Sequence, residues 1–294
     1  MAVTSPSTAT SATPQSSPLV MRIIGAVALA HLINDLIQSV LPSIYPMLKA
    51  NYGLTFTQVG LITLTFQITA SLLQPWVGYY TDRHPNPLVL PLGSICTLIG
   101  VLMLSTVGSF PMILLASALI GIGSSTFHPE ASRIARLASG GRFGLAQSTF
   151  QVGGNSGSAF GPLLAAAIII PFGQGHVAYF GLFALFSVGL LWAISRWYKA
   201  HLALFKLKAG KAATHGLSKA RVTFALAVLA FLVFSKFFYM TSITSYFTFY
   251  LIERFDLSVA SSQLHLFLFL GAVAAGTFFG GPIGDKIGRK AVIW

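Results

Sequence analysis

The sequence predicts an all-α integral membrane protein, and its composition and the spacing of its charges carry this prediction. Hydrophobic residues make up 54% of the 294 residues and charged residues only 8%, with a mean hydropathy of +0.76. A soluble domain of this size needs more surface charge to stay in solution. The few charges also leave uncharged intervals that are long enough to cross a bilayer.

Uncharged intervals locate the membrane-spanning helices in order along the chain. About 20 apolar residues, rising 1.5 Å each, cross a hydrocarbon core of roughly 30 Å. The first helix lies before Lys49, and the second lies between Lys49 and Asp82. The intervals 84–129 and 143–195 each hold two helices, because each is interrupted by a segment that contains glycine and proline. With the last two uncharged stretches, eight helices are predicted, near residues 20–49, 56–80, 87–107, 109–135, 142–170, 176–198, 221–251 and 259–283.

The cations fall mainly on one side of the predicted membrane protein. With a cytoplasmic N-terminus, that side receives Arg22, Arg83, Arg133, Arg136, Arg142, Arg196, Lys199, Lys206, Lys208, Lys211, Lys219, Arg221, Lys286, Arg289 and Lys290. The other side receives only Lys49 and Arg254. Because cytoplasmic loops are enriched in Lys and Arg, the division predicts a cytoplasmic N-terminus. Topology therefore explains the net charge of +12, and no nucleic-acid partner is expected.

Helix spacing and composition divide the chain into four predicted parts. Residues 1–19 are rich in Ser, Thr, Pro and Ala and carry no charge, which is typical of a disordered tail. They do not resemble a signal peptide, since no basic region precedes a short apolar core. Residues 20–198 form a six-helix bundle, the basic segment 199–220 is a cytoplasmic linker, and residues 221–294 begin a second bundle.

One ten-residue signature occurs twice, as GYYTDRHPNP from Gly78 to Pro87 and as GPIGDKIGRK from Gly281 to Lys290. Each copy follows a long apolar run. The repeat therefore predicts two homologous membrane-embedded halves, of which the second is only begun. We expect the sequence to be a C-terminally truncated form of a longer protein.

Six helices, a basic linker and a repeated Gly-x-x-x-Asp-Arg/Lys motif together resemble the major facilitator superfamily. The resemblance implies two six-helix bundles with substrate bound between them, of which the second bundle here has two helices and the start of a third. Within the superfamily, the runs HLINDLIQSVLPSIYP, QPWVGYYTDRHP and GIGSSTFHPEASRIARLASGGRFGLAQSTFQVGGNSGSAFGPLLAA are similar to the fosmidomycin resistance proteins. That similarity implies drug export across a bacterial inner membrane in exchange for protons.

The repeated signature supplies a predicted cytoplasmic gate. Its residues are Gly78, Asp82, Arg83, Gly281, Asp285, Lys286 and Arg289. The glycines allow close helix approach, and the aspartates can cap a helix or pair with the neighbouring cations. A solvated turn with ordinary topology cations is the alternative. Because HPNP replaces the family's Gly-Arg-Arg ending, the first copy is expected to form the weaker latch.

Small residues follow the fifth predicted helix in a pattern similar to the family's antiporter signature. Gly157, Gly161 and Pro162 form its core. Small side chains at every fourth position let another helix approach closely, and the eighth helix offers a similar stripe at Ala272, Gly276 and Gly280. The pattern predicts packing between these two helices, although such stripes are also a general membrane packing motif.

Four polar side chains share one face of the first helix. His31, Asn34, Asp35 and Gln38 fall at i, i+3, i+4 and i+7, about halfway through the span. Ionisable groups at this depth are costly and are rarely kept without a role. Asp35 is the predicted proton-coupling site, with His31 as relay. The alternative is that the cluster only hydrogen-bonds a neighbouring helix.

Two further charges lie within predicted helices. Lys236 reaches the same depth in the seventh helix as Asp35 does in the first, so the two are expected to face each other across the cavity, where the lysine suits an anionic substrate. Snorkelling toward the interface is the alternative. Glu130 is either a second proton acceptor or a structural partner of Arg133 at i+3.

Uncharged polar residues complete the predicted substrate cavity. With Asn34, Gln38 and Lys236, its candidates are Gln67, Gln151 and Asn155, for which interhelical hydrogen bonding is the alternative. No nucleotide-binding loop, metal-ligand cluster or nucleophile–base arrangement is evident. Neither a cofactor, nor a metal site, nor an enzymatic activity is therefore predicted.

The residues and the resemblance together predict a secondary active transporter in the bacterial inner membrane. It would export a small polar or anionic drug such as fosmidomycin by proton antiport and alternating access. A proton-driven importer of an organic anion is the alternative on the same fold, and a non-transporting receptor or enzyme is a remote one. The expected partners are the substrate, protons and the lipid bilayer, with the protein acting as a monomer.

Overall fold

The structure is a computed structural model that describes residues 19–208, 218–288 and 291. Its helices are α1 (Met21–Ser43), α2 (Tyr45–Tyr52), α3 (Phe56–Gln67), η1 (Ile68–Leu72), α4 (Gln74–Arg83), α5 (Val89–Thr106), α6 (Phe110–Ala138), α7 (Phe143–Leu164), η2 (Ala165–Ile169), α8 (Ile170–Phe172), η3 (Gln174–Tyr179), α9 (Phe180–Lys208), α10 (Lys219–Phe255) and α11 (Val259–Ile287). No strand occurs in the described ranges. The predicted all-α class is confirmed.

The prediction of eight membrane spans is also confirmed. Within the described part of the chain, eight helices or joined helices are long and apolar enough to cross a bilayer. They are Met21–Ser43, Phe56–Arg83, Val89–Thr106, Phe110–Ala138, Phe143–Phe172, Gln174–Leu202, Lys219–Phe255 and Val259–Gly280.

Prolines account for the interruptions inside these spans. The predicted helix 20–49 breaks at Ile44, between Pro42 and Pro46, so that α2 turns away as a separate element. The π-helical turns η1 and η2 lie just before Pro75 and Pro171, respectively. Proline removes a backbone donor and clashes with the carbonyl one turn earlier, which favours such widened turns.

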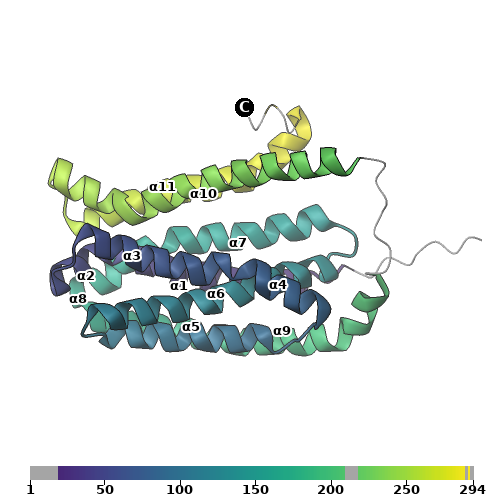
Figure 1. Ribbon diagram of the computed structural model, residues 1–294, viewed down its shortest axis with the longest axis horizontal. Helices are drawn as coiled ribbons and strands as arrows, with labels where there is room; N and C mark the ends of the chain where they lie inside the picture. Colours follow the sequence, from purple (N-terminus) through teal and green to yellow (C-terminus); the bar gives the residue numbers. More distant parts are fainter. Residues whose placement is uncertain (1–18, 209–217, 289–290, 292–294) are drawn as a thin grey trace, which may run out of the picture.

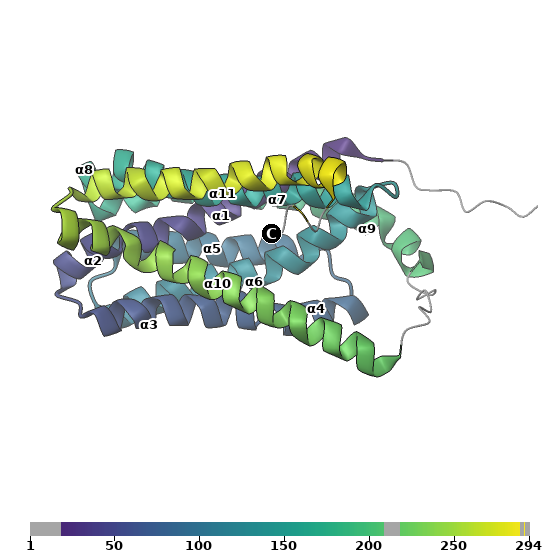
Figure 2. The ribbon, with the colours of Figure 1, turned by 90° about the horizontal axis from the view of Figure 1, so that it is seen from above.

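Helix α1 is the centre of the N-terminal bundle, by which we mean α1 to α9. It packs against α6, α7 and α9, and α5 packs between α6 and α9. Apolar α1 residues such as Leu36, Ile37 and Val40 are almost fully buried in the main core. Helices α10 and α11 form a layer on the α7 side of the bundle, opposite α5 and α9 (Figure 1), and Figure 2 shows α10 running obliquely to α11.

The two ends of the bundle differ in how they are closed. At the end that holds α2, which we call the α2 end, the Tyr52 hydroxyl donates to the Val107 carbonyl (2.5 Å) and Gln174 donates to the Leu104 carbonyl (3.1 Å). At the same end, Gln263 of α11 donates to the Ser43 carbonyl of α1. The opposite end, which we call the Asp82 end, holds the turn after α4 and the first residues of α10. Residues 219–239 of α10 are exposed there, apart from the half-buried Val222.

The boundaries of the predicted linker need correction. Helix α9 continues to Lys208, and α10 begins at Lys219, where the Ser218 hydroxyl caps the Arg221 amide (3.4 Å). Both ends of the predicted segment 199–220 are therefore helical, because the basic residues extend helices beyond the apolar spans. Residues 209–217 and most of the predicted tail 1–19 lie outside the described residues.

Candidate functional site

The Asp35 carboxylate lies between two imidazoles. His31, one turn earlier on α1, places Nε2 3.3 Å from Asp35 Oδ2, and His128 of α6 places Nε2 3.5 Å from Oδ1. The side chain of His31 is only 2% exposed, whereas those of Asp35 and His128 are 17% and 27% exposed. We call these three residues the His–Asp–His cluster. His31 was predicted beside Asp35, but His128 was not predicted as its partner.

Backbone carbonyls fix which nitrogen of each imidazole carries hydrogen. His31 Nδ1 lies 2.7 Å from the Phe150 carbonyl of α7, and His128 Nδ1 lies 3.1 Å from the Ser124 carbonyl one turn earlier. A carbonyl oxygen only accepts hydrogen bonds, so both Nδ1 atoms donate. In neutral imidazoles both Nε2 atoms are then acceptors, and they face an acceptor-only carboxylate. The cluster is therefore built to hold at least one additional proton.

Close packing holds the cluster rigidly. The His31 ring stacks on Phe150, with centroids 4.0 Å apart, and is perpendicular to His128 at 5.1 Å. Gly154 of α7 makes room for it, since a Cβ there would lie 2.4 Å from the His31 ring and 2.8 Å from Asp35 Oδ2. Gly154 is thus part of the site, although no charge or motif in the sequence marked it.

Amide side chains supply donors to the carboxylate. Asn34 and Gln38 both donate to Asp35 Oδ1, at 3.0 and 3.3 Å, and the Ser124 hydroxyl donates to Gln38 Oε1 at 3.0 Å. The predicted polar face of α1 therefore acts as one hydrogen-bonded unit that also reaches α6.

A cavity of about 150 Å³ opens beside this unit, between the N-terminal bundle and α10–α11. Its walls are Asp35, Gln38, Ser39, Pro42, Tyr45, Thr63, Phe66, Gln67, Ser158, Thr241, Thr244, Ser245 and Leu270. Polar contacts cross it, from Gln67 to the Thr241 hydroxyl (3.4 Å) and between the hydroxyls of Thr63 and Ser245 (3.4 Å). We call it the central cavity. Of the predicted cavity residues, Gln38 and Gln67 line it, together with Asp35.

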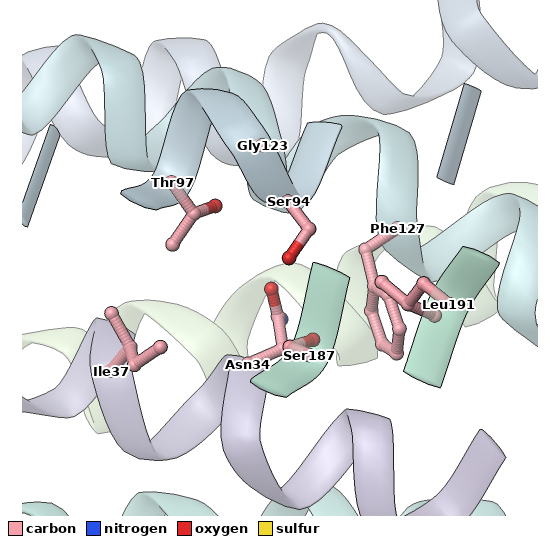
Figure 3. A pocket seen from close by; sticks show the side chains of 8 residues that line it. All are labelled: Asn34, Ile37, Ser94, Thr97, Gly123, Phe127, Ser187 and Leu191. Carbon is pink, nitrogen blue, oxygen red and sulfur yellow. The ribbon is translucent and has the colours of Figure 1, made fainter. Parts of the chain in front are cut away.

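Asn34 lines a different and much smaller cavity. This second space, of about 10 Å³, lies inside the N-terminal bundle, where the side chains of Asn34, Ser94 and Ser187 converge and Thr97 stands nearby (Figure 3). Its size and polar walls suit a single water molecule. The predicted role of Asn34 in the substrate cavity is corrected accordingly, because its side chain extends behind Asp35 toward α5 and α9.

Lys236, Gln151 and Asn155 do not line the central cavity. The Lys236 side chain is exposed on α10, its Nζ lies 5.4 Å from the ring centroid of neighbouring Phe237, and Asp35 contacts the two histidines instead. The expected Asp35–Lys236 pair is thus corrected. Asn155 donates to Thr277 of α11 (2.8 Å) and so connects two helices, whereas Gln151 donates to Asn155 (3.3 Å) within α7.

The predicted gate at the Asp82 end has an unexpected central residue. Arg133 of α6 pairs with both Asp82 and Glu130, and the buried side chain of Tyr198 also interacts with it. The expected partner Arg83 instead lies over the Tyr79 ring, 3.6 Å from its centroid. Glu130 is completely buried and pairs with Arg133.

The predicted gate also includes Gly78 and the second copy of the signature. A Cβ on Gly78 would lie 3.7 Å from Pro129, an ordinary contact, so close packing does not require glycine there. In the second copy, Arg289 and the side chains of Asp285 and Lys286 lie outside the described residues, as does the side-chain environment of Gly281.

The glycine stripe of α7 packs on α1 rather than on α11. A Cβ on Gly157 would lie 2.0 Å from the Leu32 carbonyl oxygen, and one on Gly161 would lie 1.8 Å from Ser39 Oγ. On α11, Gly276 and Gly280 have nothing within 4 Å of such a Cβ, and Ala272 is exposed. The predicted packing of these two helices is confirmed, but their small-residue stripes do not form the contact. Helix α11 contacts α7 through Leu266 and Leu270, which pack on Ala159 of α7.

The comparison with known families decides where this architecture belongs. Residues 27–294 match the family model of the Major Facilitator Superfamily. The matched region includes nearly all the described helices. The chain belongs to the major facilitator superfamily. It is accordingly a multi-pass membrane protein of a transporter superfamily, and not an enzyme.

Two curated major facilitator relatives cover most of the chain. It is 58% identical over 272 residues to the "Fosmidomycin resistance protein" of Escherichia coli (strain K12), and 39% identical over 275 residues to the "Uncharacterized MFS-type transporter YfnC" of Bacillus subtilis (strain 168). Each match covers 92% of this chain and 67% of the relative. The chain thus spans about two thirds of the length of these relatives.

Solved structures support the major facilitator fold. A bacterial homologue of the human lysosomal transporter Spinster, in an inward-facing and occupied conformation, superposes with a TM-score of 0.69 at 17% identity. That match covers 94% of this chain and 63% of the other. At this identity the likeness concerns the fold alone.

Proposed function

We propose that this chain carries the proton-coupling half of a secondary active exporter. The observation that carries the proposal is the His–Asp–His cluster, a proton-holding group on the wall of a cavity between two packed units. The 58% identity to a protein named for fosmidomycin resistance supports a small polar or anionic drug as the substrate. The transporter resides in the bacterial inner membrane as a monomer, with its N-terminus in the cytoplasm.

The cluster couples the two fluxes by competition. Substrate in the central cavity meets Asp35, which belongs to the cluster that holds the exchangeable proton, and Gln38, whose amide donates to Asp35 Oδ1. Protonation neutralises Asp35 and frees the amide donors for substrate or water, whereas deprotonation returns them to the carboxylate. Such exclusive occupancy is the requirement for antiport, since neither ligand moves without displacing the other.

The contacts between units support an alternating-access cycle. Bonds at the α2 end, among them Gln263 to Ser43 and Thr63 to Ser245, join α10 and α11 to the bundle. With a cytoplasmic N-terminus, the α2 end faces outward, so this arrangement is closed to the outside. Export requires these contacts to part while the Asp82 end closes, with Arg133 organising that end.

Drug susceptibility tests the proposal. The longest reading frame that contains this sequence is expressed in a fosmidomycin-sensitive bacterium without its own exporter, beside Asp35→Asn and the control His265→Gln. We expect raised drug tolerance in the wild type and the control, and loss of that tolerance in Asp35→Asn. Unchanged tolerance in all three strains would overturn the export proposal.

Flux measurements separate export from import. In proteoliposomes with an imposed pH gradient, labelled drug is expected to move in the direction opposite to the flow of protons. Movement of drug together with protons would support the alternative, a proton-driven importer of an organic anion. Flux that ignores the gradient would exclude proton coupling altogether.

A further inference from the structure

We infer that the His–Asp–His cluster is a binding site for a divalent transition-metal ion, with Zn²⁺ as the best-matched ion. Within the described residues, His31, Asp35 and His128 form a group whose ligand atoms all lie within 4.8 Å of one another. Two imidazole nitrogens and a carboxylate oxygen are a common three-ligand set for zinc in proteins. The inference concerns binding and does not depend on the proposed drug export.

The orientation of both imidazoles suits a metal. Metal-bound histidines usually donate the hydrogen of their other ring nitrogen to a carbonyl or carboxylate, which fixes the ring and the tautomer. Both histidines do so here, His31 to the Phe150 carbonyl and His128 to the Ser124 carbonyl. Each therefore presents the lone pair of Nε2 to the same point. A cation at that point relieves the repulsion between these acceptors and the carboxylate.

The distances suit a small tetrahedral ion. Bonds of about 2.0–2.1 Å to zinc separate neighbouring ligands by roughly 3.3 Å. His31 Nε2 lies 3.3 Å from Asp35 Oδ2 and His128 Nε2 lies 3.5 Å from Asp35 Oδ1, so each imidazole approaches a different oxygen of the carboxylate at about this spacing. Mg²⁺ and Ca²⁺ fit less well, because they prefer all-oxygen ligand sets with six or more members.

The fourth coordination position opens toward the central cavity. His31 closes the back of the site, while Asp35 lines the cavity and His128 is the most exposed of the three. A metal held there leaves one position for water or for an oxygen of a bound anion. A divalent ion with one carboxylate and two neutral imidazoles also leaves one net positive charge beside the cavity. No described cation lines that cavity to oppose it.

Metal and proton compete for the same lone pairs in this arrangement. Each Nε2 can bind a proton or a metal, but not both. Zn²⁺ in the site therefore displaces the exchangeable proton and is expected to block any cycle that needs it.

Direct titration tests the site. Untagged protein in detergent, freed of metal with a chelator that is then removed, is titrated with Zn²⁺ by calorimetry and with Co²⁺ by visible absorption. We expect one ion per chain, and at least about tenfold weaker binding in both His128→Gln and Asp35→Asn. His265→Gln is the matched control, because His265 of α11 also bonds the carbonyl one turn earlier (2.8 Å) but lies outside the cluster.

The titrations distinguish a metal site at the cluster from binding elsewhere on the protein. Absence of stoichiometric binding in the wild type would overturn the metal site. Equal binding in wild type and His128→Gln would also overturn it and would indicate binding by other histidines. Thermal unfolding verifies that His128→Gln is folded, and Asp35→Asn provides an independent second variant. Zinc binding in a protein that exports no drug would leave the metal site standing and remove the proposed function.

Discussion

At the scale of single residues, the hydrogen-bond partners of Asp35 explain its place in the membrane. A carboxylate at this depth is expensive, and here two amides donate to it and two imidazoles lie beside it. The spacing of α1 alone predicted His31, Asn34 and Gln38 as neighbours. His128 was missed as a partner because it lies 93 positions later by number and meets Asp35 only through the packing of α6 on α1.

Gly154 offers a residue-level test of the cluster. In Gly154→Ala the new Cβ overlaps the His31 ring and crowds Asp35 Oδ2, so the imidazole must move. We expect drug tolerance to fall to the level of cells without the protein, with a loss of stability of about 1–3 kcal/mol. Gly144→Ala on the same helix is the control, because nothing lies within 4 Å of its Cβ. Wild-type tolerance in Gly154→Ala would contradict the rigid cluster.

Arg133 offers a test of the ion pairs at the Asp82 end. Arg133→Leu leaves the completely buried Glu130 without its partner, which is expected to cost roughly 3–5 kcal/mol. Asp82→Asn removes an exposed partner, 68% accessible, and is expected to cost less than about 1 kcal/mol. Thermal unfolding in detergent measures both. Equal losses in the two variants would show that the buried pair is not the dominant contact.

At the scale of elements, α7 packs against α1 with one face and against α11 with another. Gly153 and Gly157 meet the backbone of α1, and Gly154 and Gly161 meet its side chains. Asn155, Ala159 and Phe160 meet α11. The sequence predicted contact between α7 and α11, which occurs, but it did not show that the glycine stripe of α7 faces α1. A stripe of small residues allows close approach by any neighbouring helix, so the sequence does not show which helix packs on it. Only the three-dimensional arrangement identifies that helix.

A graded series of substitutions tests the α1–α7 contact. Gly157→Ala is expected to cost about 3 kcal/mol, because the new Cβ meets the Leu32 backbone carbonyl, which cannot rotate away. Gly161→Ala is expected to cost about 2 kcal/mol, because the Ser39 hydroxyl can rotate away but Ser39 Cβ, at 2.8 Å, must also shift. Melting temperatures should therefore fall in the order Gly144→Ala, Gly161→Ala, Gly157→Ala. The reverse order would refute this packing.

At the scale of the whole molecule, contacts at the α2 end must break during alternating access. The hydroxyls of Thr63 on α3 and Ser245 on α10 lie 3.4 Å apart, so paired cysteines there can form a disulfide after slight adjustment. In a Cys96→Ala background, oxidised Thr63→Cys/Ser245→Cys protein is expected to lose transport and reduced protein to regain it. Each single cysteine variant is the control. Full transport by the cross-linked protein would exclude opening at this end.

The sequence by itself determined the class, the number of spans, the repeat and the family. These follow from apolar run lengths, from charge spacing and from a local motif, all of which are properties of contiguous residues. It also identified Asp35 as the costly group in the first helix, since an acidic residue amid apolar neighbours is visible without any partner.

Only the tertiary structure decided the partners. It joined His128 and Gly154 to Asp35, and it separated Lys236 from the cavity. It also showed that Asp82 forms its ion pair with Arg133 rather than with Arg83. The physical reason is the same in each case: a helix face and a depth in the membrane restrict where a side chain lies, but its neighbours depend on which helices pack together and on their rotation.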